Sequence, residues 1–270
     1  MPKLVERYSR ALVTGAGSGL GKAFTAAFIR EGIAVWGTSR NPENLEQTES
    51  FTPVKLDLVK EPSLHEWFER WDVESGGFDL VVNNAGYSTM AESEKMTAAE
   101  IENQLRVLLV GPIQLASAAA SGMRRRKNGC LINVSSVAGE MNIPFMSVYN
   151  SAKAGLSAFS QSLMLESPTD PPWIIDFRPG DFSTAFNDHI EKRFIEGSHC
   201  ERVWQQMERL MVKAPSAKIA AEDLISALGK FRHCTQYSGS FVQTSIASLA
   251  SRLLPNVLKR KVLRRYYKIP

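Results

Sequence analysis

A glycine-rich turn between a short apolar strand and a helix constrains the fold of this chain more than any other feature. Leu12 and Val13 end the expected strand, the segment 14–21 reads TGAGSGLG, and an apolar helical pattern follows as far as Gly32. At the N-terminus of such a helix, free backbone amides and the helix dipole favour a bound phosphate. The pattern predicts a dinucleotide-binding unit. The alternative is an ordinary strand–helix turn that is rich in glycine.

Three glycines of this turn have separate expected roles. Gly15 allows the tight turn, Gly19 lets the backbone approach a pyrophosphate, and Gly21 permits close packing of the helix on the strand. The next expected strand, residues 33–39, is followed by Arg40, and no acidic residue occurs before Glu43. An arginine there accommodates the 2′-phosphate of NADP, so NADP(H) is favoured over NAD(H). The alternative is a solvated arginine before an Asn-Pro turn.

Strands and helices alternate along the rest of the chain. Further strands are expected over residues 54–58, 78–82, 173–177 and 237–242. The second of these runs into the sequence NNAG at residues 83–86, where small side chains let a cofactor lie against the sheet edge. Helices are expected over about 60–71, 97–123, 149–166 and 216–230, the second of which begins with a capping box from Thr97 to Glu100.

Tyr149 and Lys153 lie four residues apart at the start of an expected helix, so their side chains share one face. A phenol with a pKa near ~10 exchanges protons poorly at neutral pH, and a neighbouring ammonium lowers that pKa. A shift of three units needs roughly 4 kcal/mol. Lysine together with a cationic nicotinamide ring in a dry cleft could supply this energy. Taken alone, the pair also fits an ordinary surface helix.

The motifs together resemble those of the short-chain dehydrogenase/reductase family. The similarity covers nearly the whole chain and is weakest after about Ser183. The motifs follow in order: TGAGSGLG, Asp57, NNAG, Ser136 thirteen residues before Tyr149, YNSAK at 149–153, and Pro179-Gly180 with Thr184. Their joint occurrence is highly specific. The resemblance implies a single domain, 1–270, with one doubly wound, mainly parallel Rossmann-like sheet and helices on both faces.

The resemblance also implies roles for individual residues. Ser136 would hydrogen-bond the substrate oxygen, Tyr149 would exchange a proton with it, and Lys153 would hold the nicotinamide ribose and lower the pKa of the tyrosine. The neighbouring Ser135 is expected to be structural. The residues expected around the cofactor are Gly15, Ser18, Gly19, Leu20, Arg40, Asp57, Leu58, Asn84, Ala85, Gly86, Tyr149, Lys153, Pro179, Gly180 and Thr184. No metal site is expected.

One position departs from the family pattern. Many relatives carry an asparagine of a proton relay in the helix before the serine, and this chain has Leu108 there. Because Pro112 has no N–H to donate to the Leu108 carbonyl, that carbonyl could hold a water leading to Lys153. The alternative is that Gly111-Pro112 is only a packing kink. If the relay is lost, Leu108→Asn should raise turnover.

The substrate side is expected in a lid over about residues 183–214. This stretch follows a strand end, where the ligand crevice of an α/β sheet lies, and it is rich in large apolar residues such as Phe186 and Trp204. The apolar content of this lid favours a lipophilic substrate over a sugar. The alternative is an amphipathic helix pair that packs on the core. His189 receives no catalytic role.

Composition and charge limit the kinds of protein that this chain can be. A hydrophobic fraction of 44% supports a packed core. We expect neither a membrane-spanning apolar run nor a secretory signal. Cys130, Cys200 and Cys234 match no metal or disulfide pattern, which favours a cytoplasmic location. Seven of the 32 basic residues lie from Arg252 onward, where no acidic residue occurs, leaving 25 basic against 28 acidic elsewhere. This distribution does not indicate a nucleic-acid-binding domain.

The basic tail, about residues 245–270, alternates cations with apolar residues. A basic amphipathic helix broken by Pro255 can lie on an anionic membrane surface. The alternative is a terminal helix packed on the body of the protein or on a sister subunit.

The expected activity is NADP(H)-dependent interconversion of a carbonyl and a secondary alcohol on a lipophilic small molecule. One alternative is a soluble ketoreductase of specialised metabolism that acts on a polar substrate. Another is an NADP-binding regulator that catalyses nothing. The resemblance implies a homodimer or homotetramer, with helices 97–123 and 149–166 as subunit contacts.

Overall fold

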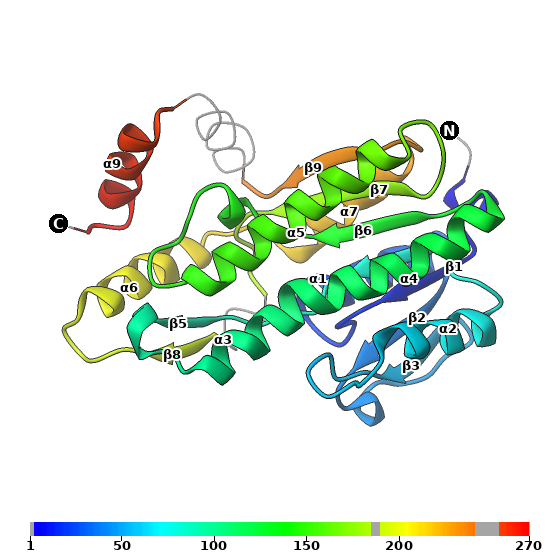
Figure 1. Cartoon of the computed structure of the whole chain (residues 1–270), viewed down its shortest axis with the longest axis horizontal. Helices are drawn as coiled ribbons and strands as arrows, with labels where there is room; N and C mark the ends of the chain where they lie inside the picture. The colour runs from blue at the N-terminus through cyan, green and yellow to red at the C-terminus, as the bar shows by residue number, and fades with distance from the viewer. Residues whose placement is uncertain (1–2, 185–189, 241–253, 270) are drawn as a thin grey trace.

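A seven-stranded, all-parallel sheet forms the centre of the molecule (Figure 1). The computed structural model describes residues 3–184, 190–240 and 254–269. In spatial order the strands are β3 (Phe51–Lys55), β2 (Ala34–Ser39), β1 (Arg10–Val13), β4 (Leu80–Asn83), β6 (Cys130–Val134), β7 (Trp173–Pro179) and β9 (Cys234–Ser238). The order reverses between β1 and β4, so the ligand crevice of this doubly wound sheet is expected at the carboxyl ends of these two strands.

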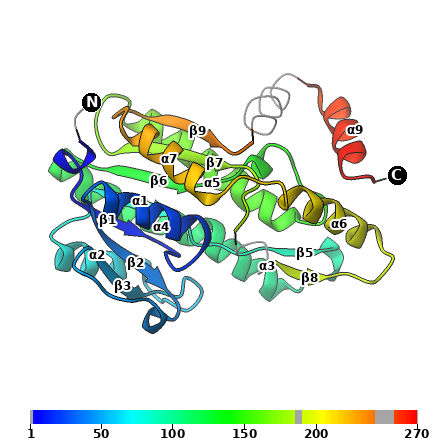
Figure 2. The ribbon, with the colours of Figure 1, turned by 180° about the vertical axis from the view of Figure 1, so that it is seen from behind.

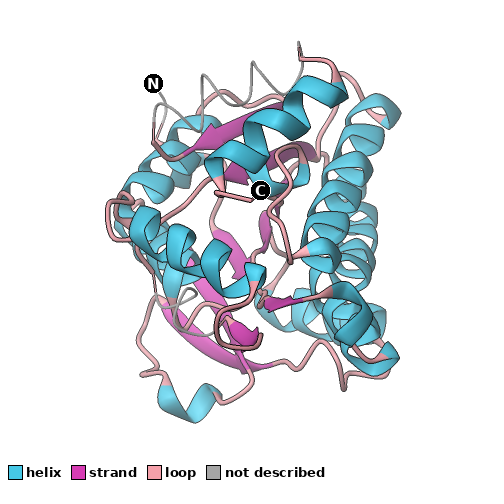
Figure 3. Ribbon diagram, turned by 90° about the vertical axis from the view of Figure 1, so that its left-hand side faces the viewer, coloured by secondary structure: helices cyan, strands magenta, loops and turns pink. Residues whose placement is uncertain are grey.

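Helices cover both faces of the sheet, as the side view shows (Figure 3). Helices α2, α4 and α5 lie on the face turned to the viewer in Figure 1, and α1 and α7 lie on the face seen in Figure 2. The helices are α1 (Gly19–Arg30), α2 (Leu64–Ser75), α3 (Ala98–Leu105), α4 (Gly111–Arg126), α5 (Ser147–Glu166), α6 (His199–Met211), α7 (Ala217–Leu228) and α9 (Asn256–Tyr266).

Alternating side chains of the strands supply the two cores. In β1, Leu12 faces the layer with α2 and α4, whereas Ala11 and Val13 face the layer with α1 and α7. In β6, Leu131 and Ile132 divide in the same way. Strands covered on both faces are mostly apolar, which is why they read as nearly continuous hydrophobic runs in the sequence. The expected fold is confirmed.

Several element boundaries differ from the expected ones. The third strand ends at Lys55 and contains Pro53, which is tolerated because β3 lies at the sheet edge. Helix α2 begins four residues later than expected because the Ser63 hydroxyl caps it, accepting from the Glu66 amide at 3.3 Å. The last strand is placed at 234–238 rather than from 237, and residues 241–242 lie outside the described residues.

One long helical segment, Ala98–Arg126, contains a π-helical turn, η4 (Arg106–Val110). The capping box at its start is confirmed, with reciprocal bonds between Thr97 and Glu100. The amide of Gly111 donates to the Arg106 carbonyl five residues back, beside the proline that lacks an N–H. This segment is long and apolar enough to span a bilayer, contrary to the sequence expectation, but 56% of its most apolar stretch is buried inside the fold. We interpret it as a core helix.

Candidate active site

Ser136 lies just beyond β6, at the carboxyl edge of the sheet. Its Oγ accepts a hydrogen bond from the Ala138 amide at 3.0 Å and so caps the turn η5 (Val137–Gly139). The same hydroxyl donates to the Pro179 carbonyl at 3.5 Å. Elements that follow β6 and β7 therefore fix the position of one buried hydroxyl.

Tyr149 and Lys153 project from the first turns of α5 toward the same strand end. The Nζ of Lys153 donates to the Val134 carbonyl at 2.6 Å and lies 5.8 Å from the centre of the Tyr149 ring. A side-chain hydrogen bond joins Tyr149 to Ser136. The structure thus brings the three expected catalytic side chains together, with Ser136 and Lys153 buried and Tyr149 half-buried.

Burial dominates the electrostatics of this cluster. It raises the pKa of Tyr149 to about 12, against the lowering effect of the hydrogen bond with Ser136, and the Asp181 carboxylate raises it further. Burial also lowers the pKa of Lys153 to about 8, opposed by the Asp176 carboxylate. In the protein alone, desolvation of the phenolate outweighs the hydrogen bond with Ser136. The lowering of the tyrosine pKa by Lys153 together with a bound nicotinamide stays a prediction.

A buried ion cluster that the sequence did not reveal lies behind the catalytic side chains. Asp176 is fully buried in β7, and its Oδ2 accepts from the Nε and Nη2 of Arg178 at 2.8 and 2.6 Å. Arg178 also pairs with Glu140 and donates to the Tyr237 hydroxyl at 2.9 Å. A buried charge without partners is costly, so each member depends on the others.

The ion cluster connects directly to the catalytic residues. The hydroxyl of Ser135, adjacent in the chain to Ser136, donates to Asp176 Oδ1 at 2.5 Å. Ser157, one turn beyond Lys153 on α5, donates to Asp176 Oδ2 at 2.7 Å. Asp176 therefore holds both elements that carry the catalytic side chains. The structural role expected for Ser135 fits these bonds.

The glycine-rich turn adopts the conformation that its sequence requires. Gly15 and Gly19 have φ angles of 68° and 52°, in the left-handed region that favours glycine. A Cβ on Gly21 would lie 2.1 Å from the Gly15 carbonyl oxygen, so a side chain cannot be accommodated there. These positions give the backbone the tight path expected of a phosphate-binding turn.

The N-terminus of α1 suits an anion. The Ser18 side chain makes no capping hydrogen bond, and the first turn contains no acidic residue. A Cβ on Gly19 would lie 3.6 Å from Thr184 Cβ, so the loop after β7 lies over this turn. The partly buried Leu20 side chain packs on the core. The cradle fits the pyrophosphate of a nicotinamide dinucleotide.

Thr14 ties the glycine-rich turn to the NNAG turn. Its hydroxyl accepts from the amides of Asn84 and Ala85 at 2.9 and 3.0 Å and donates to the Val82 carbonyl at 3.2 Å. The Asn84 side chain donates to the Thr14 carbonyl at 2.9 Å. Gly86 is exposed next to this turn. The two loops at the switch point of the sheet are thus joined.

Two further expected cofactor residues differ in how they could act. Asp57 is engaged locally, with its Oδ1 accepting from the Val59 amide at 3.0 Å. Leu58 has a buried side chain in the core, and its carbonyl accepts from Arg106 Nε at 3.2 Å. Only the backbone and the remaining carboxylate oxygen of this turn could face an adenine.

Arg40 is exposed at the end of β2. Burial raises the pKa of Tyr87, which follows the NNAG turn, and the positive charge of Arg40 opposes that rise. Arg40 therefore lies on the side of the sheet edge shared with the NNAG turn. Gly180 also lies at this edge, where its amide donates to the Ser238 carbonyl at 2.8 Å.

Leu108, in the π-helical turn, has a buried side chain. A Cβ on Gly86 would come within 2.8 Å of Leu108 Cδ2, so leucine occupies space beside the NNAG turn. The irregular helix at Gly111-Pro112 is present. The water-mediated relay through the Leu108 carbonyl stays a prediction, to be tested by Leu108→Asn.

An apolar cluster lies against the catalytic tyrosine. Strand β8 (Glu191–Arg193), which pairs with β5 (Thr89–Ala91), and helix α6 form the expected lid region, whose Phe186 and His189 lie outside the described residues. Tyr149 packs against the cluster, whose buried members are Met90, Met146, Ile190, Cys200, Val203, Trp204, Met207, Met211 and Tyr267.

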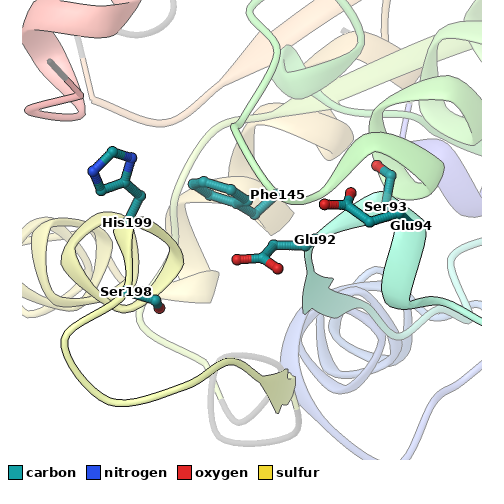
Figure 4. A pocket seen from close by; sticks show the side chains of 6 residues that line it. All are labelled: Glu92, Ser93, Glu94, Phe145, Ser198 and His199. Atoms are coloured by element: carbon teal, nitrogen blue, oxygen red, sulfur yellow. The ribbon is translucent and has the colours of Figure 1, made fainter.

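An open pocket of about 510 Å³ lies at one side of this lid (Figure 4). Glu92, Ser93 and Glu94 line it from one side, and Ser198 and His199 from the start of α6. Phe145 also lines it and packs on the same apolar cluster as Tyr149. The pocket is therefore connected with the lid, although its own lining is mostly polar.

Comparison with known proteins agrees with this arrangement. The sequence model of the short chain dehydrogenase family matches residues 9–193. A 3-ketodihydrosphingosine reductase from Bacteroides thetaiotaomicron is 32% identical over 179 residues, which is 66% of this chain and 65% of the relative. The match thus spans slightly less than two thirds of that relative.

Solved structures show the same fold over nearly the whole chain. A short-chain dehydrogenase from Streptomyces avermitilis has a TM-score of 0.80 and 25% identity, with 96% of this chain and 98% of that chain covered. A Burkholderia phymatum short chain dehydrogenase/reductase in complex with NAD has a TM-score of 0.79 at 18% identity, covering 94% and 95%. The chain belongs to the short-chain dehydrogenase family.

Proposed function

We propose that this protein is an NADP(H)-dependent oxidoreductase that interconverts a carbonyl and a secondary alcohol on a lipophilic substrate. The observation that carries the proposal is the cluster of Ser136, Tyr149 and Lys153 at the end of β6, in which the serine and lysine are buried and a hydrogen bond joins the tyrosine to the serine. Acid–base groups at the carboxyl edge of a doubly wound sheet occupy the position where its ligands bind.

The residues of the cluster divide the work of a carbonyl reduction. A nicotinamide dinucleotide held by the glycine-rich turn would supply the hydride. Tyr149 gives its phenolic proton to the substrate oxygen, and Ser136 donates a hydrogen bond to that oxygen as negative charge develops. The Lys153 ammonium, held by the Val134 carbonyl, stabilises the phenolate that remains. In alcohol oxidation Tyr149 accepts the proton instead.

The preference for NADP(H) rests on Arg40. Its exposed guanidinium at the end of β2 suits a 2′-phosphate, which would form charge-assisted hydrogen bonds with it. The Burkholderia neighbour was solved with NAD, but at 18% identity it supports the fold alone. Arg40 is therefore the residue that separates the two cofactors in this chain.

A lipophilic substrate is supported by the side chains around the tyrosine. Tyr149 packs against a cluster of methionines, aliphatic residues and Trp204, and flexible methionines adapt to apolar ligands of varied shape. The Bacteroides relative bears the name of a 3-keto reductase, which fits carbonyl reduction as the chemistry. The polar lining of the pocket in Figure 4 favours, as a second candidate, a ketone with a polar portion.

A panel of ketones and alcohols assayed with NADPH, NADP, NADH and NAD tests the proposal. We expect turnover of long-chain ketones with NADPH, and a loss of about 10²–10⁴-fold in Tyr149→Phe with cofactor binding retained. The matched control is Tyr8→Phe, because Tyr8 is a buried tyrosine that lies just before β1, at the opposite edge of the sheet from the proposed site. Cofactor binding without turnover of any panel member would instead support a non-catalytic, cofactor-sensing protein.

A further inference from the structure

The C-terminal helix α9 contacts the lid of the proposed active site. Tyr267, directly after the helix, is buried in the apolar cluster that contains Met90 and Trp204, and Leu263 and Ile269 pack on the same cluster. Asp181, which raises the pKa of Tyr149, also raises the pKa of Tyr267. Figure 1 shows α9 at the same end of the molecule as α6. The helix therefore lies close to the proposed substrate site.

Helix α9 has a second apolar face that stays exposed among the described residues. Leu258, Val262 and Tyr266 recur every four residues, so they form one stripe along the helix. Their exposed fractions are 45%, 45% and 40%, and Val257 beside them is 59% exposed. Leu263 and Tyr267 occupy a different face of the same helix. An outward apolar stripe that no described residue covers marks an interaction surface.

The charges around the stripe identify its partner. Helix α9 carries Lys259, Arg260, Lys261, Arg264 and Arg265 and contains no acidic residue. By helical position, Lys261 and Arg265 border the outward stripe on one side and Lys259 borders it on the other. Cations beside an apolar stripe complement the phosphates and acyl chains of an anionic bilayer surface. A second copy of α9 would instead bring like charges together.

We propose that α9 docks this protein on an anionic membrane surface, with Leu258 and Val262 in the interface and Lys261 and Arg265 against lipid phosphates. Because Leu263 and Tyr267 pack on the lid, the docked face lies next to the wall of the proposed active site. A lipophilic substrate could then pass from the bilayer to the apolar cluster without crossing water. The substrate route rests on the proposed function, whereas the docking does not.

Sedimentation with vesicles tests the docking on the full chain. Phosphatidylcholine vesicles with and without phosphatidylserine are incubated with the wild type, with Leu258→Ser/Val262→Ser and with Lys261→Gln/Arg265→Gln. We expect the wild type to sediment with the anionic vesicles and each double variant to lose about tenfold or more in partition. Val73→Ser on α2, at 79% exposure, and Arg30→Gln/Lys60→Gln are matched controls that should bind as the wild type.

The outcomes separate docking from catalysis. Equal sedimentation with both vesicle types, or undiminished binding of both double variants, would overturn the proposal. If the wild type does not bind vesicles and either double variant has a smaller mass than the wild type in light scattering, the stripe is a contact between two copies of this chain. Turnover of a water-soluble ketone should be unchanged in the double variants. Vesicle binding by a chain that reduces no ketone would refute the enzyme and leave the docking intact.

Discussion

The side chain of Leu108 fills the space that any side chain on Gly86 would need, with Cδ2 only 2.8 Å from the position of such a Cβ. Leu108 is buried, so it has little room to move aside. The proposed cofactor cleft and the π-helical turn are therefore matched in shape at this point. This pairing gives the first prediction.

Gly86→Ala should destabilise the protein by about 1–3 kcal/mol, because the added methyl overpacks the site. Leu108→Ala alone should cost about 2–5 kcal/mol through the cavity that it leaves. The double variant should be more stable than the sum predicts by roughly 1 kcal/mol or more, since the shortened side chain accommodates the methyl. Urea unfolding of the four proteins measures this coupling. Strict additivity would show that the two residues do not compete for space.

The second prediction concerns Asp176 as a positioning residue. Asp176→Asn keeps the side-chain volume but removes the negative charge that pairs with the buried Arg178. The free energy of unfolding should therefore fall by about 3–5 kcal/mol. Because Asp176 raises the pKa of Lys153, the substitution should also move the lysine-dependent limb of the pH–rate profile to lower pH. Ser157→Ala, which removes the hydrogen bonds to Asp176 and from Arg178 but no charge, should leave that limb in place. An unshifted limb in Asp176→Asn would restrict Asp176 to a structural role.

The third prediction follows from the pKa of Lys153, lowered from 10.5 to about 8 by burial. Between these values the unfolded chain binds more protons than the folded one, so the lysine makes stability rise as pH increases from 8 to 10.5. The stability of Lys153→Met should not rise over this pH range, and the stability of this variant relative to the wild type should be greatest below pH 8. Denaturant unfolding at pH 7 and pH 9.5 tests the sign. A wild-type advantage that grows toward acid pH would contradict it.

The fourth prediction concerns Arg40 and the choice of cofactor. Arg40→Gln should lower kcat/KM for NADPH by about 10–100-fold, because it removes a hydrogen bond to a charged group. It should leave kcat/KM for NADH nearly unchanged. Steady-state kinetics with both cofactors measures the ratio. Arg30→Gln, an exposed arginine at the end of α1, controls for loss of a positive charge. A parallel decrease for both cofactors would remove Arg40 from the recognition of the 2′-phosphate.

Local patterns in the sequence were enough for the sheet and for the central part of the site. The left-handed glycines at 15 and 19 and the spacing of Tyr149 and Lys153 are short-range features, and their geometry follows from bonds within a few residues. The limits of elements were less predictable. The expected strand 54–58 left out Pro53, and tertiary pairing at the edge of the sheet placed that proline inside β3.

Long-range partners could not be predicted. Arg178 meets Glu140 and Tyr237, which are 38 and 59 residues away, and no sequence spacing connects them. The rise in the tyrosine pKa was also missed, because the sequence shows the neighbouring lysine but not the depth of burial. Only packing reveals that the outward stripe of α9 is separate from the face that contacts the lid.

The hydroxyl of Thr14 has a consequence for how variation in this cleft is constrained. A single oxygen receives two amides of one loop while belonging to the other, so neither loop can shift its backbone alone. Valine, which has the same shape, would leave both amides without an acceptor, and serine would preserve them. Natural or engineered changes in cofactor binding should therefore accumulate at the exposed rim near Arg40, and Thr14 should tolerate replacement by serine but not by valine.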